Sequence, residues 1–182
     1  MASDINITWV VSSSFKPRSG QIEQMKAKGP IWGPYNQQTK CDLDFCVITE
    51  YTELSHLINR RVHERCHLWV TESLYQKMGN PDRVQTYKHS VNPSLDRPEE
   101  LLSLVLAGER YSVTVGVGFN LKPPSNSLSQ LKKFQHMQWL SSVSNIVKTY
   151  DQTQWVFCDV TAPANNFAKF SNISFDKLKS VL

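Results

Sequence analysis

The sequence predicts an α/β fold: a three-layer sandwich with a mostly parallel sheet of about five or six strands and helices on both faces. Strand-like and helix-like patterns alternate along the chain, which is typical of βαβ units. The first apolar, β-branched run ends in three serines, as expected of a strand that presents a polar loop at its carboxyl end. The alternative is an α+β sandwich with a mixed sheet, because the segment 83–91 can pair in either direction.

The expected elements follow one another in regular alternation. Helices are expected where apolar residues recur every three to four positions. Asp96 is expected to cap one of them, with Pro98 in its first turn. The segment 29–35 is predicted as a loop because glycine and proline punctuate it. The expected helices are 19–28, 52–62, 96–108, about 127–149 and a C-terminal segment. The expected strands are 5–13, 42–50, 67–71, 83–91, 111–119 and 155–161.

Composition indicates an ordinary globular protein. The chain has 182 residues, of which 40% are hydrophobic and 20% charged, and this length fits a single α/β domain over 1–182. The formal net charge of +4 permits contacts with phosphates but is well short of a dedicated nucleic-acid arm. The sequence shows neither a signal peptide nor a membrane-spanning run, so we expect an intracellular, cytoplasmic protein with no membrane contact.

The cysteines are expected to be buried, because all four lie in or beside predicted strands. A zinc site is the alternative for a cluster that also holds two histidines. Zinc ligands usually pair through tight knuckles, whereas Cys41 and Cys46 flank a strand and face opposite sides. We therefore predict no metal site, and no cofactor is indicated. The residues weighed for zinc are Cys41, Cys46, His63, Cys66 and His67.

The turn after the first predicted strand is the sharpest candidate for a binding site. Ligands of open parallel sheets bind outside the carboxyl ends of the strands. A serine that caps the following helix would leave N–H groups that attract an anion, and two cations could add direct contacts. Glycine and an amide end the strand 111–119, where a ligand can come close. The predicted ligand-binding residues are Ser12, Ser13, Ser14, Lys16, Arg18, Ser19, Gly118 and Asn120.

Two acids that follow predicted strands, Glu50 and Asp159, are the candidates for catalysis. Either could supply acid–base or metal-binding chemistry to an anionic substrate. The segment 154–159 resembles the apolar strand of nucleotide-sugar glycosyltransferases that leads into a metal-holding Asp-x-Asp pair. In this chain Thr161 stands in place of the second acid. The resemblance implies a small transferase or hydrolase that uses Asp159.

Two further surfaces are indicated by charge and by aromatic content. The basic segment 59–67 predicts nucleic-acid contacts through Arg60, Arg61 and Arg65, provided that aromatic side chains stack beside them. The loop 29–35 predicts a protein interface anchored by Trp32 and Tyr35, because large aromatic side chains often anchor such surfaces.

These observations favour a binding protein for an anionic ligand at the carboxyl ends of the strands. The ligand would be a nucleotide, a phosphorylated small molecule or a nucleic-acid backbone. One alternative is a protein-interaction or assembly subunit without a small-molecule site, of the kind that viruses and phages encode. The other alternative is the transferase or hydrolase described above.

Overall fold

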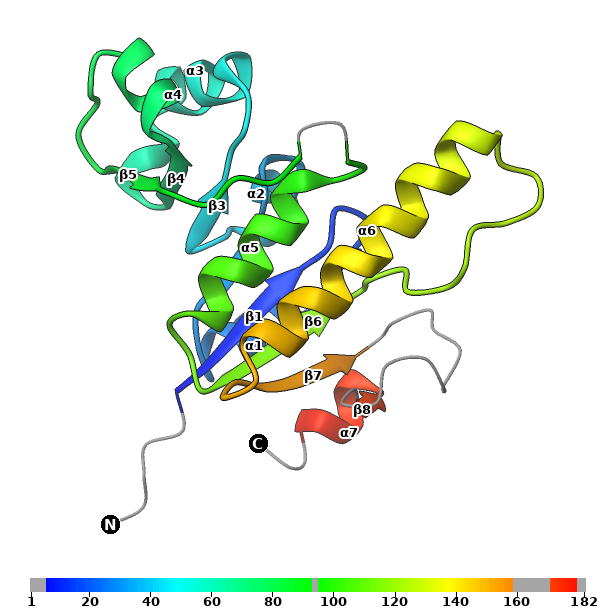
Figure 1. Cartoon of the computed structure of the whole chain (residues 1–182). Coiled ribbons are helices and arrows are strands. Elements are labelled where there is room, and N and C mark those ends of the chain that lie inside the picture. Colours follow the sequence, from blue (N-terminus) through cyan, green and yellow to red (C-terminus); the bar gives the residue numbers. More distant parts are fainter. Residues whose placement is uncertain (1–5, 93–94, 159–170, 180–182) are drawn as a thin grey trace.

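The structure, a computed structural model, describes residues 6–92, 95–158 and 171–179, and in these residues it contains one parallel sheet of eight strands. The α/β class is therefore confirmed, although the sheet has more strands than predicted. The strand order across the sheet is β5-β4-β3-β2-β1-β6-β7-β8 (Figure 1). The strands are β1 (Ile7–Val11), β2 (Ile31–Pro34), β3 (Phe45–Val47), β4 (His67–Thr71), β5 (Val84–Tyr87), β6 (Val113–Val117), β7 (Gln154–Cys158) and β8 (Ser171–Ile173).

Helices cover both faces of the sheet, as a three-layer sandwich requires. Two long helices, α5 and α6, lie side by side over one face (Figure 1). Shorter helices, among them α1, α3, α4 and α7, pack on the other face. The helices are α1 (Gln21–Lys26), α2 (Gln38–Cys41), α3 (Tyr51–Asn59), α4 (Glu72–Lys77), α5 (Pro98–Gly108), α6 (Gln130–Thr149) and α7 (Phe175–Lys179), with 3-10 turns η1 (Tyr35–Gln37) and η2 (Val62–Glu64).

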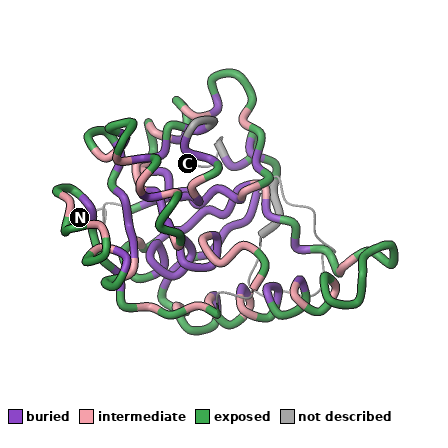
Figure 2. The backbone as a smooth tube through the Cα atoms, turned by 90° about the horizontal axis from the view of Figure 1, so that it is seen from above, coloured by how far each residue is buried: buried purple, intermediate pink, exposed green. Residues whose placement is uncertain are grey.

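The core has two halves, one on each side of the sheet. Successive residues of a strand point to opposite faces, so Trp9 and Val11 pack under the short helices while Val10 packs under α5 and α6. All five residues of β1 are buried, and so are all five of β6. Figure 2 shows this buried centre, surrounded by exposed segments. Central strands of a parallel sheet are covered on both faces, so their residues are buried along the whole strand and are mostly apolar.

The prediction that 29–35 is a loop was wrong, because Ile31–Pro34 forms strand β2 between β1 and β3. Trp32 is fully buried, and its ring stacks on Phe45 with 4.3 Å between centroids. Tyr35, in η1, is half-buried. The proposed interface anchored by Trp32 and Tyr35 is wrong for the same reason, since its principal side chain belongs to the core.

Two other expectations need correction. The segment 83–91 contributes β5, which pairs parallel with β4, so the mixed-sheet alternative does not hold for the described residues. Asp96 does not cap α5. The N-cap is Arg97, which adopts a left-handed conformation with φ 55°, and Pro98 is the first helical residue, as predicted.

The order of the strands sets the place where a ligand would bind. The chain builds β1 to β5 toward one edge and then returns through α5 to place β6 beside β1. Neighbouring chain segments therefore leave β1 and β6 in opposite directions, and a crevice opens between them at the carboxyl ends. The serine turn after β1 and the segment after β6 meet at this topological switch point.

Candidate functional site

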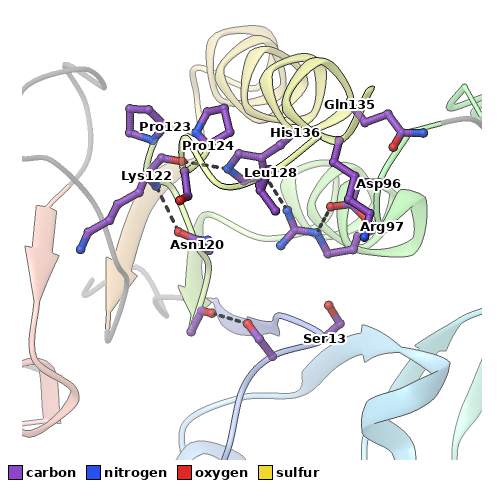
Figure 3. Close-up of a pocket in the computed structure, with 14 residues that line it drawn as sticks. Ser13, Asp96, Arg97, Asn120, Lys122, Pro123, Pro124, Leu128, Gln135 and His136 are labelled. Atoms are coloured by element: carbon purple, nitrogen blue, oxygen red, sulfur yellow. Dashed lines mark hydrogen bonds and ion pairs between the residues drawn. The ribbon is translucent and has the colours of Figure 1, made fainter. Parts of the chain in front are cut away.

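A cleft of about 700 Å³ lies at the carboxyl ends of β1 and β6, at the switch point of the sheet (Figure 3). Its floor comes from the turns after these two strands. One wall comes from the start of α5, and the other from the first turns of α6 with the loop that leads into it. The lining residues are Ser13, Ser14, Asp96, Arg97, Gly118, Asn120, Lys122, Pro123, Pro124, Ser125, Leu128, Lys132, Gln135 and His136.

The serine turn ties β1 to β6. The Ser12 hydroxyl is fully buried and donates to the carbonyl of Gly118 over 2.6 Å. The Ser14 hydroxyl reaches the same carbonyl over 3.2 Å and lies 3.0 Å from the Ser12 hydroxyl. These two serines therefore hold the floor of the cleft together, and only Ser14 of the two lines it.

The remaining serine of the turn, Ser13, is hydrogen-bonded to a carboxylate group of the protein itself, that of Glu100. The backbone N–H and the hydroxyl of Ser13 both donate to Oε1 of Glu100, each over 2.5 Å. Glu100 projects from the first turn of α5 and is completely buried. Burial raises the pKa of this carboxyl group, while Arg97 and the bonds from Ser13 oppose the rise. The two donors that Ser13 would offer to a ligand are thus satisfied within the fold.

Arg97 forms the centre of one wall. Its guanidinium group stacks over the ring of Trp139 at 4.1 Å, and one of its nitrogens lies 3.2 Å from a carboxylate oxygen of Asp96. A second nitrogen lies 3.7 Å from Glu100, and a third donates to Nδ1 of His136 over 3.1 Å. These contacts fix the direction of the guanidinium group, so its positive charge is positioned before any ligand arrives.

The hydrogen bonds of His136 assign its tautomer. Nε2 lies 2.8 Å from the carbonyl oxygen of Lys122, which can only accept, so Nε2 carries the hydrogen. Nδ1 then accepts from Arg97, which can only donate. The ring is buried and lies parallel to Trp139 with 5.8 Å between centroids. His136 therefore joins the loop after β6 to the start of α5 and positions Arg97.

The exposed cations of the cleft are Lys122 and Lys132. Lys122 follows β6, and in Figure 3 its side chain extends away from Arg97 toward the opposite side. Lys132 lies in the first turn of α6, whose N-cap Ser129 accepts from the Lys132 backbone N–H. Among the lining residues that the structure describes, Asp96 is the one acid, and it pairs with Arg97. The charge around the cleft is therefore positive and favours an anion.

The structure brings together four of the eight predicted ligand-binding residues, since Ser13, Ser14, Gly118 and Asn120 all line the cleft. Ser12 lies buried beneath them. The remaining three predicted residues do not line it. Lys16 is exposed, and Arg18 pairs with Asp176 of α7 over 3.3 Å.

Ser19 does not cap α1, because the N-cap is Gly20 and no side-chain bond is made there. The predicted use of Ser19 as an anion-binding cap is therefore wrong. With only six residues, α1 also offers a much weaker dipole than the prediction assumed.

The three predicted nucleic-acid contacts lie at the other edge of the sheet. Arg60 and Arg61 follow α3, which runs back toward the amino ends of the strands, and Arg65 lies two residues before the start of β4. Arg61 pairs with Glu64 over 2.6 Å. The other two line a small hollow of about 200 Å³ beside Tyr35. These arginines therefore cannot extend the cleft, although an aromatic ring does lie beside two of them.

Neither candidate catalytic acid is placed in the cleft. Asp159 lies outside the described residues, and Glu50 is exposed at the N-cap of α3 and does not line the cleft. Glu53, one turn later in α3, is the acid with a strongly altered environment. Burial, together with the charges of Glu99 and Glu50, raises its pKa from 4.5 to about 7.

We expect the Glu53 carboxyl group to make the stability of the fold depend on pH. Between pH 4.5 and about 7 the native state keeps a proton that the unfolded chain has released, so the free energy of unfolding falls as pH rises. Because Glu53 is partly exposed to solvent, the effect on stability is smaller than the full pKa shift implies. We expect the free energy of unfolding to fall by about 1–2 kcal/mol over this pH range. In urea unfolding at several pH values, the free energy of unfolding of Glu53→Gln should not show this fall with rising pH.

The matched control for that experiment is Glu72→Gln, since Glu72 is an exposed acid in the first turn of α4. It should leave the pH dependence of the wild-type protein intact. Parallel pH profiles for Glu53→Gln and the wild type would show that another group is responsible.

All four cysteines are buried, as predicted. Within residues 6–92, 95–158 and 171–179, no group of three or more histidine, cysteine or acidic side chains could hold a metal ion. In the same residues no helix combines the length and apolar character needed to cross a bilayer.

The sequence reasoning did not place in the site the three cations of the cleft or the histidine that positions one of them. Arg97, Lys122, Lys132 and His136 belong to segments that are remote from the serine turn in sequence. A signal for the last three was the run from Arg110 to Tyr150, which contains five lysine and arginine residues and no acid, whereas Arg97 lies outside this run. Comparison with protein-family models, curated proteins and solved structures finds no match to this chain.

Proposed function

We propose that this protein binds a small phosphorylated molecule of nucleotide size in the cleft at the switch point. The observation that carries the proposal is that Arg97, Lys122 and Lys132 all line a cleft to which the described residues contribute one acid, Asp96. Guanidinium and ammonium groups are the usual partners of phosphate oxygens.

The position and size of the cleft support the same proposal. Open parallel sheets bind ligands where the strand order reverses, which is between β1 and β6 in this chain. A volume of about 700 Å³ lies within the usual range for sites of small molecules and cofactors. The hydroxyl of Ser14 and the amide of Asn120 add polar groups that can orient such a ligand.

A nucleic-acid strand fits the observations less well than a small molecule. Binding along a strand calls for a basic groove with aromatic side chains on which bases stack. The cations of the cleft are grouped at the carboxyl edge of the sheet, whereas Arg60 and Arg65 lie at the amino edge. A small anion needs only the cations of the cleft and makes no use of Arg60 and Arg65.

Calorimetry with ATP, a sugar nucleotide, inorganic phosphate and a short oligonucleotide tests the proposal. We expect one of the small phosphorylated probes to bind, and Lys122→Ala and Lys132→Ala each to weaken it about tenfold, as expected for the loss of a charge-assisted contact. Both lysines are exposed, so neither substitution should unfold the protein.

Three control variants locate the site. Lys148→Ala removes an exposed lysine from the last turn of the same helix and should change nothing. Lys16→Ala and Arg18→Ala test the turn predicted from the sequence and should also leave binding unchanged. If Lys16→Ala and Arg18→Ala lose binding while Lys122→Ala and Lys132→Ala keep it, the site lies at that turn and not in the cleft. Preference for the oligonucleotide over every small probe would overturn the proposal.

A further inference from the structure

The outer side of α6 carries most of the large hydrophobic side chains that are exposed among the described residues. Five large hydrophobic side chains are exposed among the described residues, and four of them fall between positions 128 and 137. The exposed fractions are 38% for Leu128, 66% for Leu131, 59% for Phe134 and 51% for Met137. We refer to Leu131, Phe134 and Met137, with Leu128 just before the helix, as the α6 stripe.

The geometry of the helix explains why the α6 stripe is uncovered. With 20 residues, α6 is about 30 Å long, whereas a five-residue strand spans about 17 Å. The N-terminal half of α6 therefore extends past the ends of β6 and β7 (Figure 1). Residues three apart share a face, so Leu131, Phe134 and Met137 lie together, opposite the buried Trp139 and Val143.

The α6 stripe itself carries no charge. On the same outer face lie four exposed polar residues, Gln130, Gln138, Ser141 and Asn145. Two lysines flank the α6 stripe, Lys132, which lines the cleft, and Lys133, which is half-buried. An anionic membrane surface is usually bound through clusters of four to eight cations, and an acidic partner would also need cations here. A neutral partner fits this face best.

We propose that the α6 stripe pairs with the α6 stripe of a second copy of this chain. In an antiparallel pair centred on Phe134, residues at equal distances on either side of Phe134 face one another across the two-fold axis. Leu131 then meets the partner's Met137, and Gln130 meets the partner's Gln138. Apolar side chains face apolar ones, and amides that both donate and accept face amides. The face is therefore complementary to itself.

The area of the α6 stripe sets the expected strength of the dimer. A large apolar side chain offers on the order of 200 Å² when fully exposed, so the four residues supply roughly 400 Å². A standard interface buries about 800 Å² on each partner. The two glutamines add area, but the contact remains at the small end of the range. We expect a reversible dimer that dissociates at micromolar concentrations.

Sedimentation equilibrium over about 5 to 500 µM tests the pairing, a range that spans the affinities of weak interfaces. The wild type should approach a dimer at the upper end, and Phe134→Gln should weaken association at least about tenfold. Tyr51→Gln is the matched control, because Tyr51 is an exposed aromatic residue on α3, on the other face of the sheet. It should dimerise like the wild type.

Cysteine cross-linking tests the antiparallel register without depending on affinity. Phe134→Cys should form a disulfide-linked dimer under mild oxidation, because this position lies on the two-fold axis. Lys148→Cys, exposed near the other end of α6, should not cross-link. The four native cysteines are buried and should contribute no background.

Several results would overturn the proposal. They are a wild-type protein that stays monomeric up to the highest concentration, a Phe134→Gln dimer of unchanged strength, or equal cross-linking at positions 134 and 148. Binding to vesicles that contain phosphatidylserine, lost in Phe134→Gln while the wild type stays monomeric, would assign the α6 stripe to a membrane surface instead.

Discussion

Replacing Glu100 with alanine is expected to lower the free energy of unfolding by about 3–5 kcal/mol, as for other buried ion pairs that lose one partner. The carboxylate accepts from the backbone N–H and the hydroxyl of Ser13 and lies 3.7 Å from Arg97. Alanine would leave the Ser13 N–H without its acceptor and a partly buried guanidinium group without one of its two acids.

The Glu100→Ala variant also carries a prediction about anions. Its empty carboxylate position is bounded by the Ser13 donors and by Arg97, and these are the groups that hold small carboxylates in other proteins. Formate or acetate should therefore raise the melting temperature of Glu100→Ala more than that of the wild type, by mass action on the native state. Chloride at equal ionic strength is the control for general salt effects.

The conservative variant Glu100→Gln separates charge from hydrogen bonding. Its amide oxygen can still accept from Ser13, but it offers Arg97 no negative charge. We expect a loss of stability smaller than that of Glu100→Ala and no response to formate. A Glu100→Ala protein within about 1 kcal/mol of the wild type would show that the Ser13 donors and Arg97 are satisfied by other groups.

The α/β class was predictable because alternation of strand and helix patterns is a local property of the sequence. β2 was not, because the glycines and prolines in it and just before it, at positions 29, 30, 33 and 34, are typical of a turn. In the structure, Gly29 and Gly33 are needed because neighbouring atoms leave no room for a side chain. A Cβ atom on Gly29 would lie 2.1 Å from the carbonyl oxygen of Ile7, and one on Gly33 would lie 2.7 Å from the side chain of Val11. They permit close packing beside β1, which depends on contacts distant in sequence.

The place of the candidate site was predictable from the rule for strand ends, but its chemistry was not. Ser13 looked like an anion-binding donor because its partner, Glu100, lies 87 residues away. The charged wall is assembled by Arg97 from α5 and Lys132 from α6, and no motif joins them. A single sequence shows which side chains follow a strand, whereas their partners depend on how the helices pack.

Trp32→Ala is expected to destabilise the fold by about 3–5 kcal/mol, the usual cost of removing a large aromatic side chain from a core. The ring is completely buried at the centre of the sheet. It stacks on Phe45 and lies 5.7 Å from the ring of Trp69, measured between centroids. A truncation there leaves a cavity that the neighbouring strands cannot close, since β2 is paired on both sides.

Two measurements on Trp32 variants test whether this residue supports the core or a surface. Chemical denaturation should give the large loss for Trp32→Ala and a smaller one for Trp32→Phe, which retains most of the ring. Sedimentation at a temperature where both variants are folded should give the same association as the wild type, because no part of the ring reaches solvent. A stable Trp32→Ala protein with altered association would place the ring on a surface and contradict the assignment of β2.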